Sequence, residues 1–352
     1  MTRITLMVPD PDESRVPLSV GRTRVERMSP RAAIEADRLV KHFGETVAVD
    51  GVSFSVPEGS VLGLLGPNGA GKTTTVRMMA TLTRPTSGTA RVAGHDIVGD
   101  PAAVRRSMGL TGQAATVDEL LTGRENLRLI GALYGLPASY IRTASEELLE
   151  RFALADARDR IVKTYSGGMR RRLDLAVSLI ATPPVLFLDE PTTGLDPRSR
   201  VELWEVLRGL VREGTTLLLT TQYLEEADTL ADNIVVIDKG HIIAEGTPLQ
   251  LKDQSGAAAV VVTVSHGDDL PRAEDVLRAV VPEYHVDQGA RQLSAPASGL
   301  GDMTRIAAAF DGSGIDLDDL GLKRPSLDDV FLRLTGHRAE EEPERQGEEA
   351  LR

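Results

Sequence analysis

A glycine-rich segment near residue 70 has the clearest potential for chemistry. Between Gly66 and Thr73 it fits the pattern G-x-x-x-x-G-K-[ST], in which backbone N–H groups cradle nucleotide phosphates. Lys72 would reach the β- and γ-phosphates, and the Thr73 hydroxyl would ligate Mg²⁺. We therefore predict nucleotide-binding residues at Gly66, Pro67, Asn68, Gly69, Ala70, Gly71, Lys72, Thr73 and Thr74.

A pair of carboxylates follows a second apolar segment. The run Val185-Leu186-Phe187-Leu188 ends in Asp189 and Glu190. Two acids at the end of a strand can be solvated turn residues. After a phosphate loop, however, this arrangement is typical of nucleotide hydrolysis, with Asp189 in the Mg²⁺ shell and Glu190 polarising the attacking water.

A third motif, Tyr165-Ser166-Gly167-Gly168-Met169, lies between the other two. Ser166 is a good helix N-cap, and the two glycines leave backbone N–H groups open to a phosphate. The residues that follow place an apolar face at helical spacing: Leu173, Ala176, Val177 and Ile180. Taken alone, the segment could also be a plain helix start.

The elements that must position these motifs alternate along the chain. Residues 34 to about 250 alternate strand-like and helix-like segments, which predicts an α/β fold. The phosphate loop follows a strand at Val61–Leu65 and precedes a helix from Thr73. Further strands are predicted at Met108–Leu110, Val185–Leu188, Leu217–Thr220 and Ile234–Asp238, and helices at Glu125–Leu136 and Ser139–Phe152.

The order of the motifs resembles that of an ATP-binding-cassette nucleotide-binding domain over residues 34 to 250. Ser166-Gly167-Gly168 matches the core of that family's signature, with departures at Tyr165 and Met169. The resemblance implies a P-loop cassette with a helical subdomain at about 118–175, and with ATP and Mg²⁺ as ligands. It also implies that Ser166, Gly167 and Gly168 bind nucleotide and that Lys72 and Glu190 act in catalysis.

Three more positions take their roles from the resemblance. Phe43 stands where the family stacks an aromatic ring on adenine, although it could also be a core aromatic of a short strand pair. Gln113, at the end of the predicted strand Met108–Leu110, matches a glutamine that contacts Mg²⁺. Gly194-Leu195-Asp196 matches the loop that crosses to a second subunit, with Asp196 near nucleotide.

One departure from the family pattern concerns catalysis. A histidine that contacts the γ-phosphate is replaced here by Gln222. Its amide can donate a hydrogen bond but cannot carry a positive charge or shuttle a proton. The surrounding run from Thr220 to Asp228, and the ending from Arg324 to Leu332, resemble the daunorubicin/doxorubicin-resistance type of ATP-binding subunits.

Composition narrows the class of protein. The 352 residues include no cysteine and carry a net charge of -12 without a basic block, which argues against nucleic-acid binding. No apolar run approaches the ~18 residues of a membrane span. We expect a cytoplasmic protein that reaches the inner face of the cell membrane only through a partner.

The chain is predicted to divide into four segments. Residues 1–31 are expected to be a disordered extension, 32–253 the cassette, 254–338 an accessory domain and 339–352 an acidic disordered tail. The accessory region has the order strand, helix, strand, strand, helix, strand, helix, which suggests a ferredoxin-like βαββαβ unit. Its last helix has one apolar face, made of Leu327, Val330, Phe331 and Leu334.

The resemblance implies an ATPase that powers a drug- or metabolite-exporting transporter, working as a homodimer with a separate membrane permease. The accessory region would then hold the dimer together or contact the permease, with Leu327 and Phe331 as apolar anchors, unless these side chains close the small domain's own core. Two other functions stay open. One is a nucleotide-gated binding module with little turnover, suggested by Gln222, and the other is a soluble cassette ATPase outside transport.

Overall fold

The computed structural model describes residues 31–112, 116–255 and 258–335. Residues 1–30 of the predicted N-terminal extension, the predicted acidic tail and Gln113 fall outside these ranges. Within them, no helix is long and apolar enough to span a bilayer.

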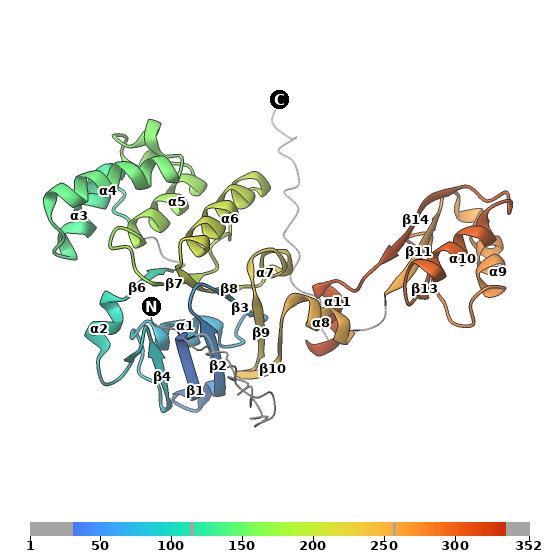
Figure 1. The fold of residues 1–352 in the computed structure, drawn as a ribbon, viewed down its shortest axis with the longest axis horizontal. Helices are drawn as coiled ribbons and strands as arrows, with labels where there is room; N and C mark the ends of the chain where they lie inside the picture. Colours follow the sequence, from blue (N-terminus) through green and yellow to red (C-terminus); the bar gives the residue numbers. More distant parts are fainter. Residues whose placement is uncertain (1–30, 113–115, 256–257, 336–352) are drawn as a thin grey trace, which may run out of the picture. The chain divides into compact units, whose positions relative to one another are not determined.

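Two sheets form the framework of the cassette (Figure 1). One has four antiparallel strands in the order β2-β1-β4-β5, with bounds Thr46–Pro57, Ala32–Phe43, Ser87–Val92 and His95–Asp96. The other has six strands in the order β10-β9-β3-β8-β7-β6. Their bounds are His241–Gly246, Asn233–Asp238, Val61–Leu65, Thr216–Thr221, Val185–Asp189 and Met108–Thr111. All pairs of the second sheet are parallel except β10 with β9.

The inner strands β3, β7 and β8 are buried at every position and are mostly apolar, so both faces of the sheet are covered there. Leu186 and Leu188 of β7 join one hydrophobic cluster, whereas Val185 and Phe187 join the other. This alternation follows from the two-residue repeat of a strand. The sheet therefore fixes its register against two different partners, which are helices on one side and the four-stranded sheet with its helix α1 on the other.

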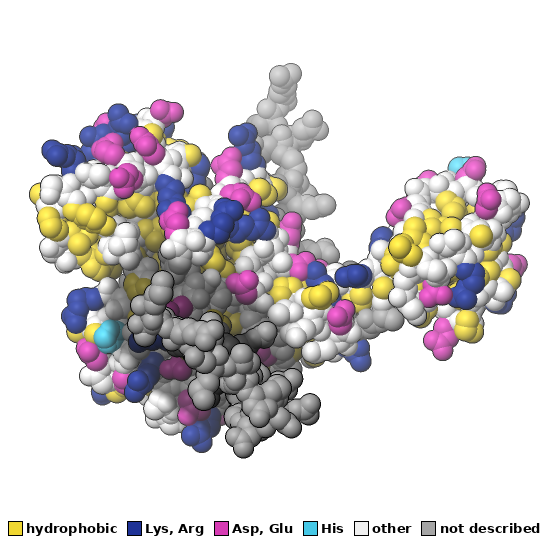
Figure 2. Space-filling model, viewed as in Figure 1, with side chains coloured by type: hydrophobic (Ala, Val, Ile, Leu, Met, Phe, Trp, Pro, Cys, Tyr) yellow, Lys and Arg dark blue, Asp and Glu magenta, His cyan; other side chains and the backbone are white. Residues whose placement is uncertain are grey.

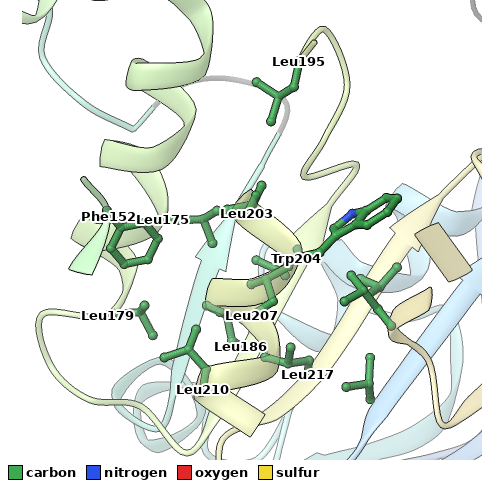
Figure 3. Packing of buried hydrophobic residues seen from close by; sticks show 14 of the residues in the cluster. Phe152, Leu175, Leu179, Leu186, Leu195, Leu203, Trp204, Leu207, Leu210 and Leu217 are labelled. Carbon is green, nitrogen blue, oxygen red and sulfur yellow. The ribbon is translucent and has the colours of Figure 1, made fainter. Parts of the chain in front are cut away.

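Helices complete the cassette. Figure 3 shows side chains of α5 and α6, among them Leu175 and Leu203, packed over Leu186 and Leu217 of the sheet. The helices of the cassette are α1 (Lys72–Met79), α2 (Pro101–Arg106), α3 (Gly123–Leu133), α4 (Ala138–Arg151), α5 (Gly167–Ser178), α6 (Pro197–Arg212), α7 (Leu224–Leu230) and α8 (Pro248–Ser255), with single 3₁₀ turns at Ala155–Ala157 and Val162–Thr164.

The helix predicted at Glu125–Leu136 begins and ends earlier than expected. Thr122 caps its start, since the Thr122 hydroxyl accepts from the Glu125 N–H and the Glu125 carboxylate accepts from the Thr122 N–H. Gly135 follows its end with φ of +71°, a conformation that suits glycine. The apolar pattern indicated the helix, and these two local signals set its limits.

A small α+β unit follows α8. Its order is β11 (Ala259–Val264), a 3₁₀ turn (Gly267–Asp269), α9 (Leu270–Arg278), β12 (His285–Asp287), β13 (Gln292–Pro296), α10 (Leu300–Phe310) and β14 (Leu317–Lys323). The sheet order is β12-β13-β11-β14, with antiparallel neighbours throughout. A separate apolar cluster, which includes Val262, Leu277 and Phe310, forms its core. This is the βαββαβ order that the sequence suggested.

The terminal helix α11 (Leu327–Thr335) differs from the expectation. Leu327, Val330 and Phe331 belong to the hydrophobic cluster of the cassette and not to that of the small unit. The helix packs against α8 and α7, and Arg333 donates to the carbonyl of Gln254 at 3.1 Å. These side chains neither close the core of the small unit nor stand exposed as anchors for a partner, because they cover the cassette itself.

This packing predicts the effect of two substitutions on one helix. Phe331 is 4% exposed, so Phe331→Ala should lower the free energy of unfolding by about 3 kcal/mol. Leu334 is 41% exposed, so Leu334→Ala should change it by less than about 0.5 kcal/mol. Chemical denaturation of the full chain measures both, and equal effects would contradict the burial of this face against the cassette.

Candidate nucleotide site

The parallel strands bring the three chemical segments to one edge of the sheet. Strand β3 lies next to β8, and β8 lies next to β7. The phosphate loop follows β3, the two carboxylates close β7, and Gln222 follows β8. Ligands of open α/β sheets bind outside the carboxyl ends of the strands, so this edge is the candidate site.

The phosphate loop is wrapped tightly against its neighbours. A Cβ on Gly66 would lie 2.2 Å from the carbonyl oxygen of Ile237, and Gly71 has φ of +108°. Only glycine fits these two positions. The Lys72 side chain is 4% exposed, and its ammonium donates to the carbonyls of Gly66 at 2.7 Å and Pro67 at 3.1 Å. The predicted phosphate ligand is therefore held inside the curl of its own loop.

Asp189 connects the loop to the sheet. Its Oδ1 accepts from the Thr73 hydroxyl at 3.1 Å and from the Thr220 hydroxyl at 2.6 Å. The Asp189 side chain is 5% exposed. A hydroxyl and a carboxylate oxygen this close are the hard donors that Mg²⁺ prefers, usually together with water and phosphate oxygens. Thr73 and Asp189 thus fit the metal role that the sequence predicted for them.

Glu190 has an unusual backbone conformation. Its φ is +52°, in the left-handed region that a non-glycine residue seldom adopts. Its N–H reaches both the carbonyl and the hydroxyl of Thr220, each at 3.1 Å. The carboxylate lies 4.0 Å from the Lys72 ammonium and accepts from the Thr193 hydroxyl at 3.4 Å. The second carboxylate is thereby placed beside the residue predicted to bind the γ-phosphate.

The exposure of Phe43 and of Gln222 bears on the nucleotide contacts predicted for them. Phe43 closes β1 and is 53% exposed, so it is not the core aromatic considered as an alternative. The amide oxygen of Gln222 is buried and has no hydrogen-bond partner among the residues that the structure describes. A buried acceptor without a partner is costly, so Gln222 is suited to a polar group that binds in the site.

The Ser166 and Asp196 motifs are built as helix starts. The Ser166 hydroxyl accepts from the Met169 N–H at 3.2 Å and caps α5, as the sequence predicted. Asp196 caps α6 through the N–H and hydroxyl of Ser199, at 3.2 and 2.6 Å. Gly168 lies against Ser199 and Leu195, so the two motifs are neighbours. None of these interactions reaches the phosphate loop.

Sequence reasoning missed three residues of this region. Thr220 hydrogen-bonds both carboxylate-bearing residues, yet it is one of three threonines in its strand and nothing in the sequence distinguishes it from the others. Arg171 lies in a run of three arginines that suggests a solvated surface. Glu226 is fully buried on α7 beside the exposed Glu225, and two adjacent glutamates give no signal for which one points inward.

Glu226 is a carboxyl group inside the hydrophobic core. Its Oε1 accepts from the Trp204 Nε1–H at 3.3 Å, and burial raises the pKa of the Glu226 carboxyl above its ordinary value of 4.5. It lies four residues after Gln222, on helix α7, which follows β8. The carboxyl therefore links α6 and α7 behind the end of β8.

Comparison with known proteins agrees with this geometry. The family model described as ABC transporter matches residues 49–193. The chain is 53% identical over 310 residues to the daunorubicin resistance ATP-binding protein DrrA2 of Streptomyces coeruleorubidus, covering 88% of this chain and 96% of that protein. It is 43% identical to the Nod factor export ATP-binding protein I of Ralstonia nicotianae, covering 86% and 94%.

Solved structures share the cassette fold. An ATP-binding subunit of an ABC transporter superposes with a TM-score of 0.58 at 28% identity and covers 63% of this chain and 92% of its own. The subunit cbiO1 of Clostridium perfringens gives a TM-score of 0.59 at 25% identity, covering 63% and 91%. The chain belongs to the ABC transporter family. Within it, the chain is an ATP-binding subunit that hydrolyses ATP to drive transport.

The buried Glu226 predicts a pH effect on stability. A carboxyl whose folded pKa is raised binds its proton more tightly in the native state, so stability falls as pH rises from about 4.5 through the raised value. The neutral isostere Glu226→Gln should remove this part of the fall. We expect the free energy of unfolding of Glu226→Gln, relative to the parent, to increase with pH. A difference that is constant from pH 5 to 9, measured by denaturation, would contradict it.

Proposed function

We propose that the chain is the cytoplasmic ATPase subunit of an exporter for drugs or metabolites, and that it works as a homodimer on a separate membrane permease. The observation that carries this proposal is the contact of the phosphate loop with the two carboxylates. The Thr73 hydroxyl donates a hydrogen bond to the Asp189 carboxylate at 3.1 Å, and the Lys72 ammonium lies 4.0 Å from the Glu190 carboxylate. These residues form the set that phosphoryl transfer to water requires.

Each residue has a separate chemical task. The backbone N–H groups of the loop and the Lys72 ammonium would bind and neutralise the phosphates. Thr73, Asp189 and the predicted ligand Gln113 would hold Mg²⁺, which when bound neutralises charge on the phosphates. Glu190 would accept a hydrogen bond from the attacking water and increase its nucleophilicity. Phe43, exposed at the end of β1, would stack on the base.

The homodimer follows from what one chain lacks. Its Ser166-Gly167-Gly168 segment caps α5 with open backbone N–H groups, a suitable end for a phosphate. In cassette proteins each ATP lies between the phosphate loop of one subunit and this segment of the other. A chain with one copy of each motif needs a second copy to complete both sites. ATP would then close the interface and hydrolysis would open it.

The exporter class is proposed from the relatives. Those with drug-resistance names reach 53% identity, and the Nod factor export subunit reaches 43%. Cargo selection would lie in the permease. Figure 2 shows hydrophobic side chains gathered around α3, where Leu129, Leu133 and Tyr134 are 43%, 74% and 42% exposed. Such exposed apolar side chains are suited to a protein partner.

A second candidate is favoured by Gln222. Without a histidine at this position, the chain could bind ATP and change its association while turning over very slowly. Steady-state phosphate release separates this nucleotide-gated module from a working ATPase.

One prediction concerns the proposed catalytic carboxylate. Glu190→Gln should keep ATP affinity but lower turnover at least about 100-fold, because the amide is a far weaker base for the water. It should also trap an ATP-bound dimer, visible by size-exclusion chromatography with light scattering. Lys72→Ala is the contrasting variant, and its ATP affinity should fall roughly tenfold or more. Near-parental turnover in Glu190→Gln would refute the assignment of the base.

A further prediction concerns the departure at Gln222. Gln222→Ala should lower turnover by about 10- to 100-fold, since the closed site loses a hydrogen-bonding group. Gln222→His should equal or exceed the parent, because an imidazole can also carry charge. Both are measured as kcat for phosphate release at saturating ATP. If Gln222→Ala turns over at the parental rate, this side chain takes no part in catalysis.

A further inference from the structure

One arginine hydrogen-bonds the backbone of residues 189–191, the catalytic segment that carries the two carboxylates. Arg171 lies on α5, and its guanidinium donates to four main-chain carbonyls. Nη2 reaches the carbonyls of Asp189 at 3.0 Å and Glu190 at 2.7 Å, and Nε reaches that of Pro191 at 2.8 Å. Three successive carbonyls therefore converge on one cation.

This convergence accounts for the unusual backbone of Glu190. A φ of +52° on a non-glycine residue costs on the order of 1–3 kcal/mol and persists only where the surroundings hold it. Here Thr220 binds the Glu190 N–H, and Arg171 binds the Glu190 carbonyl. Hydrogen bonds to a charged donor are the stronger kind. The two interactions fix both ends of the residue and so fix the direction of its carboxylate.

The same helix also holds the segment that leads to Gln113. Nη1 of Arg171 donates to the carbonyl of Gly112 at 2.6 Å. Asp174, on the same side of α5, accepts from the Thr116 N–H at 2.7 Å and lies 3.9 Å from Arg171. The residues between Gly112 and Thr116 lie outside the described ranges. Gly112 and Thr116, on either side of these residues, are thus both held by side chains on one face of α5.

The charges and acceptors around Arg171 favour a guanidinium at this position. Burial lowers the pKa of Arg171, while the nearby carboxylates of Asp174, Asp189, Glu226 and Glu190 oppose that shift. The side chain is only 13% exposed. A nearly buried cation needs several acceptors at once, and the planar fork of a guanidinium can serve several carbonyls where a single ammonium cannot.

We propose that Arg171 is a positioning residue, which sets the orientation of Glu190 and couples it to the helix that begins at Ser166. Since α5 starts at Gly167, about one turn before Arg171, closure of Ser166 on the partner copy's nucleotide moves the helix that holds Glu190 in the chain's own site. The inference rests on the role of Glu190 under the proposed function. In each subunit, Arg171 would thereby couple the Ser166 segment, which meets the partner copy's nucleotide, to Glu190 in the subunit's own nucleotide site.

The neighbouring arginines provide matched controls. Arg170 pairs with Glu119 at 2.8 Å and Arg172 with Glu202 at 3.5 Å, and neither interaction reaches the catalytic segment. We expect Arg171→Met to lower kcat about 30-fold or more with the KM for ATP changed less than about threefold, since ground-state binding is untouched. Arg170→Met and Arg172→Met should keep kcat within about threefold. Equal kcat for all three variants would overturn the proposal.

Guanidinium rescue separates positioning from a general loss of packing. Addition of millimolar guanidinium to Arg171→Ala should restore part of kcat, and Arg170→Ala should show no such gain. Arg171→Lys keeps the charge but not the fork, so an intermediate kcat is expected. If Arg171→Met does not fold, Arg171→Lys decides the outcome, and a parental kcat in that variant would overturn the proposal.

A double substitution distinguishes this inference from the proposed function. If Arg171 acts through Glu190, Arg171→Met should slow single-turnover hydrolysis much less in the Glu190→Gln background than in the parent. The same fold-change in both backgrounds would overturn the positioning role and leave the ATPase assignment intact. Parental turnover in Glu190→Gln alone would instead remove the base on which both proposals rest.

Discussion

Two nearly buried carboxylates constrain the whole edge of the sheet that carries the candidate site. Asp189 and Glu190 are 5% and 10% exposed, and a buried charge is strongly unfavourable unless donors or cations surround it. Thr73 and Lys72 at the start of α1 and Thr220 on β8 meet that requirement. The requirement is satisfied only when β3, β7 and β8 lie side by side. The sheet order and the chemistry therefore depend on each other.

Much of this arrangement could be predicted because the signals were local or strongly periodic. Strand β3 has the predicted bounds, and β7 extends only one residue beyond its prediction, since a strand buried on both faces is apolar throughout. The phosphate loop needs glycine where backbone approaches backbone, as at Gly66. The roles of the site residues, including those of Gln113, Phe43 and Asp196, stay predictions.

Other features depend on contacts that no local pattern specifies. Amphipathic spacing gave the apolar face of α11 but not what covers it, and the cover is the cassette beside α8. Arg171, 13% exposed, and Glu226, fully buried, each stand beside residues of like charge, so the sequence alone indicates solvated surfaces. Arg171 finds a partner in Asp189 of β7, and Glu226 finds one in Trp204 of α6. Burial of such groups is a property of the folded chain.

Disulfide cross-linking tests most directly whether each nucleotide site is shared between two copies of the chain. The chain has no cysteine, so Asn68→Cys and Ser166→Cys each introduce a single exposed thiol, here placed in the Glu190→Gln background. A mixture of the two variants should form a covalent heterodimer in the presence of ATP and Mg²⁺, because the thiols meet across the interface. Absence of that cross-link despite ATP binding, or a disulfide within one doubly substituted chain, would contradict a site shared between subunits.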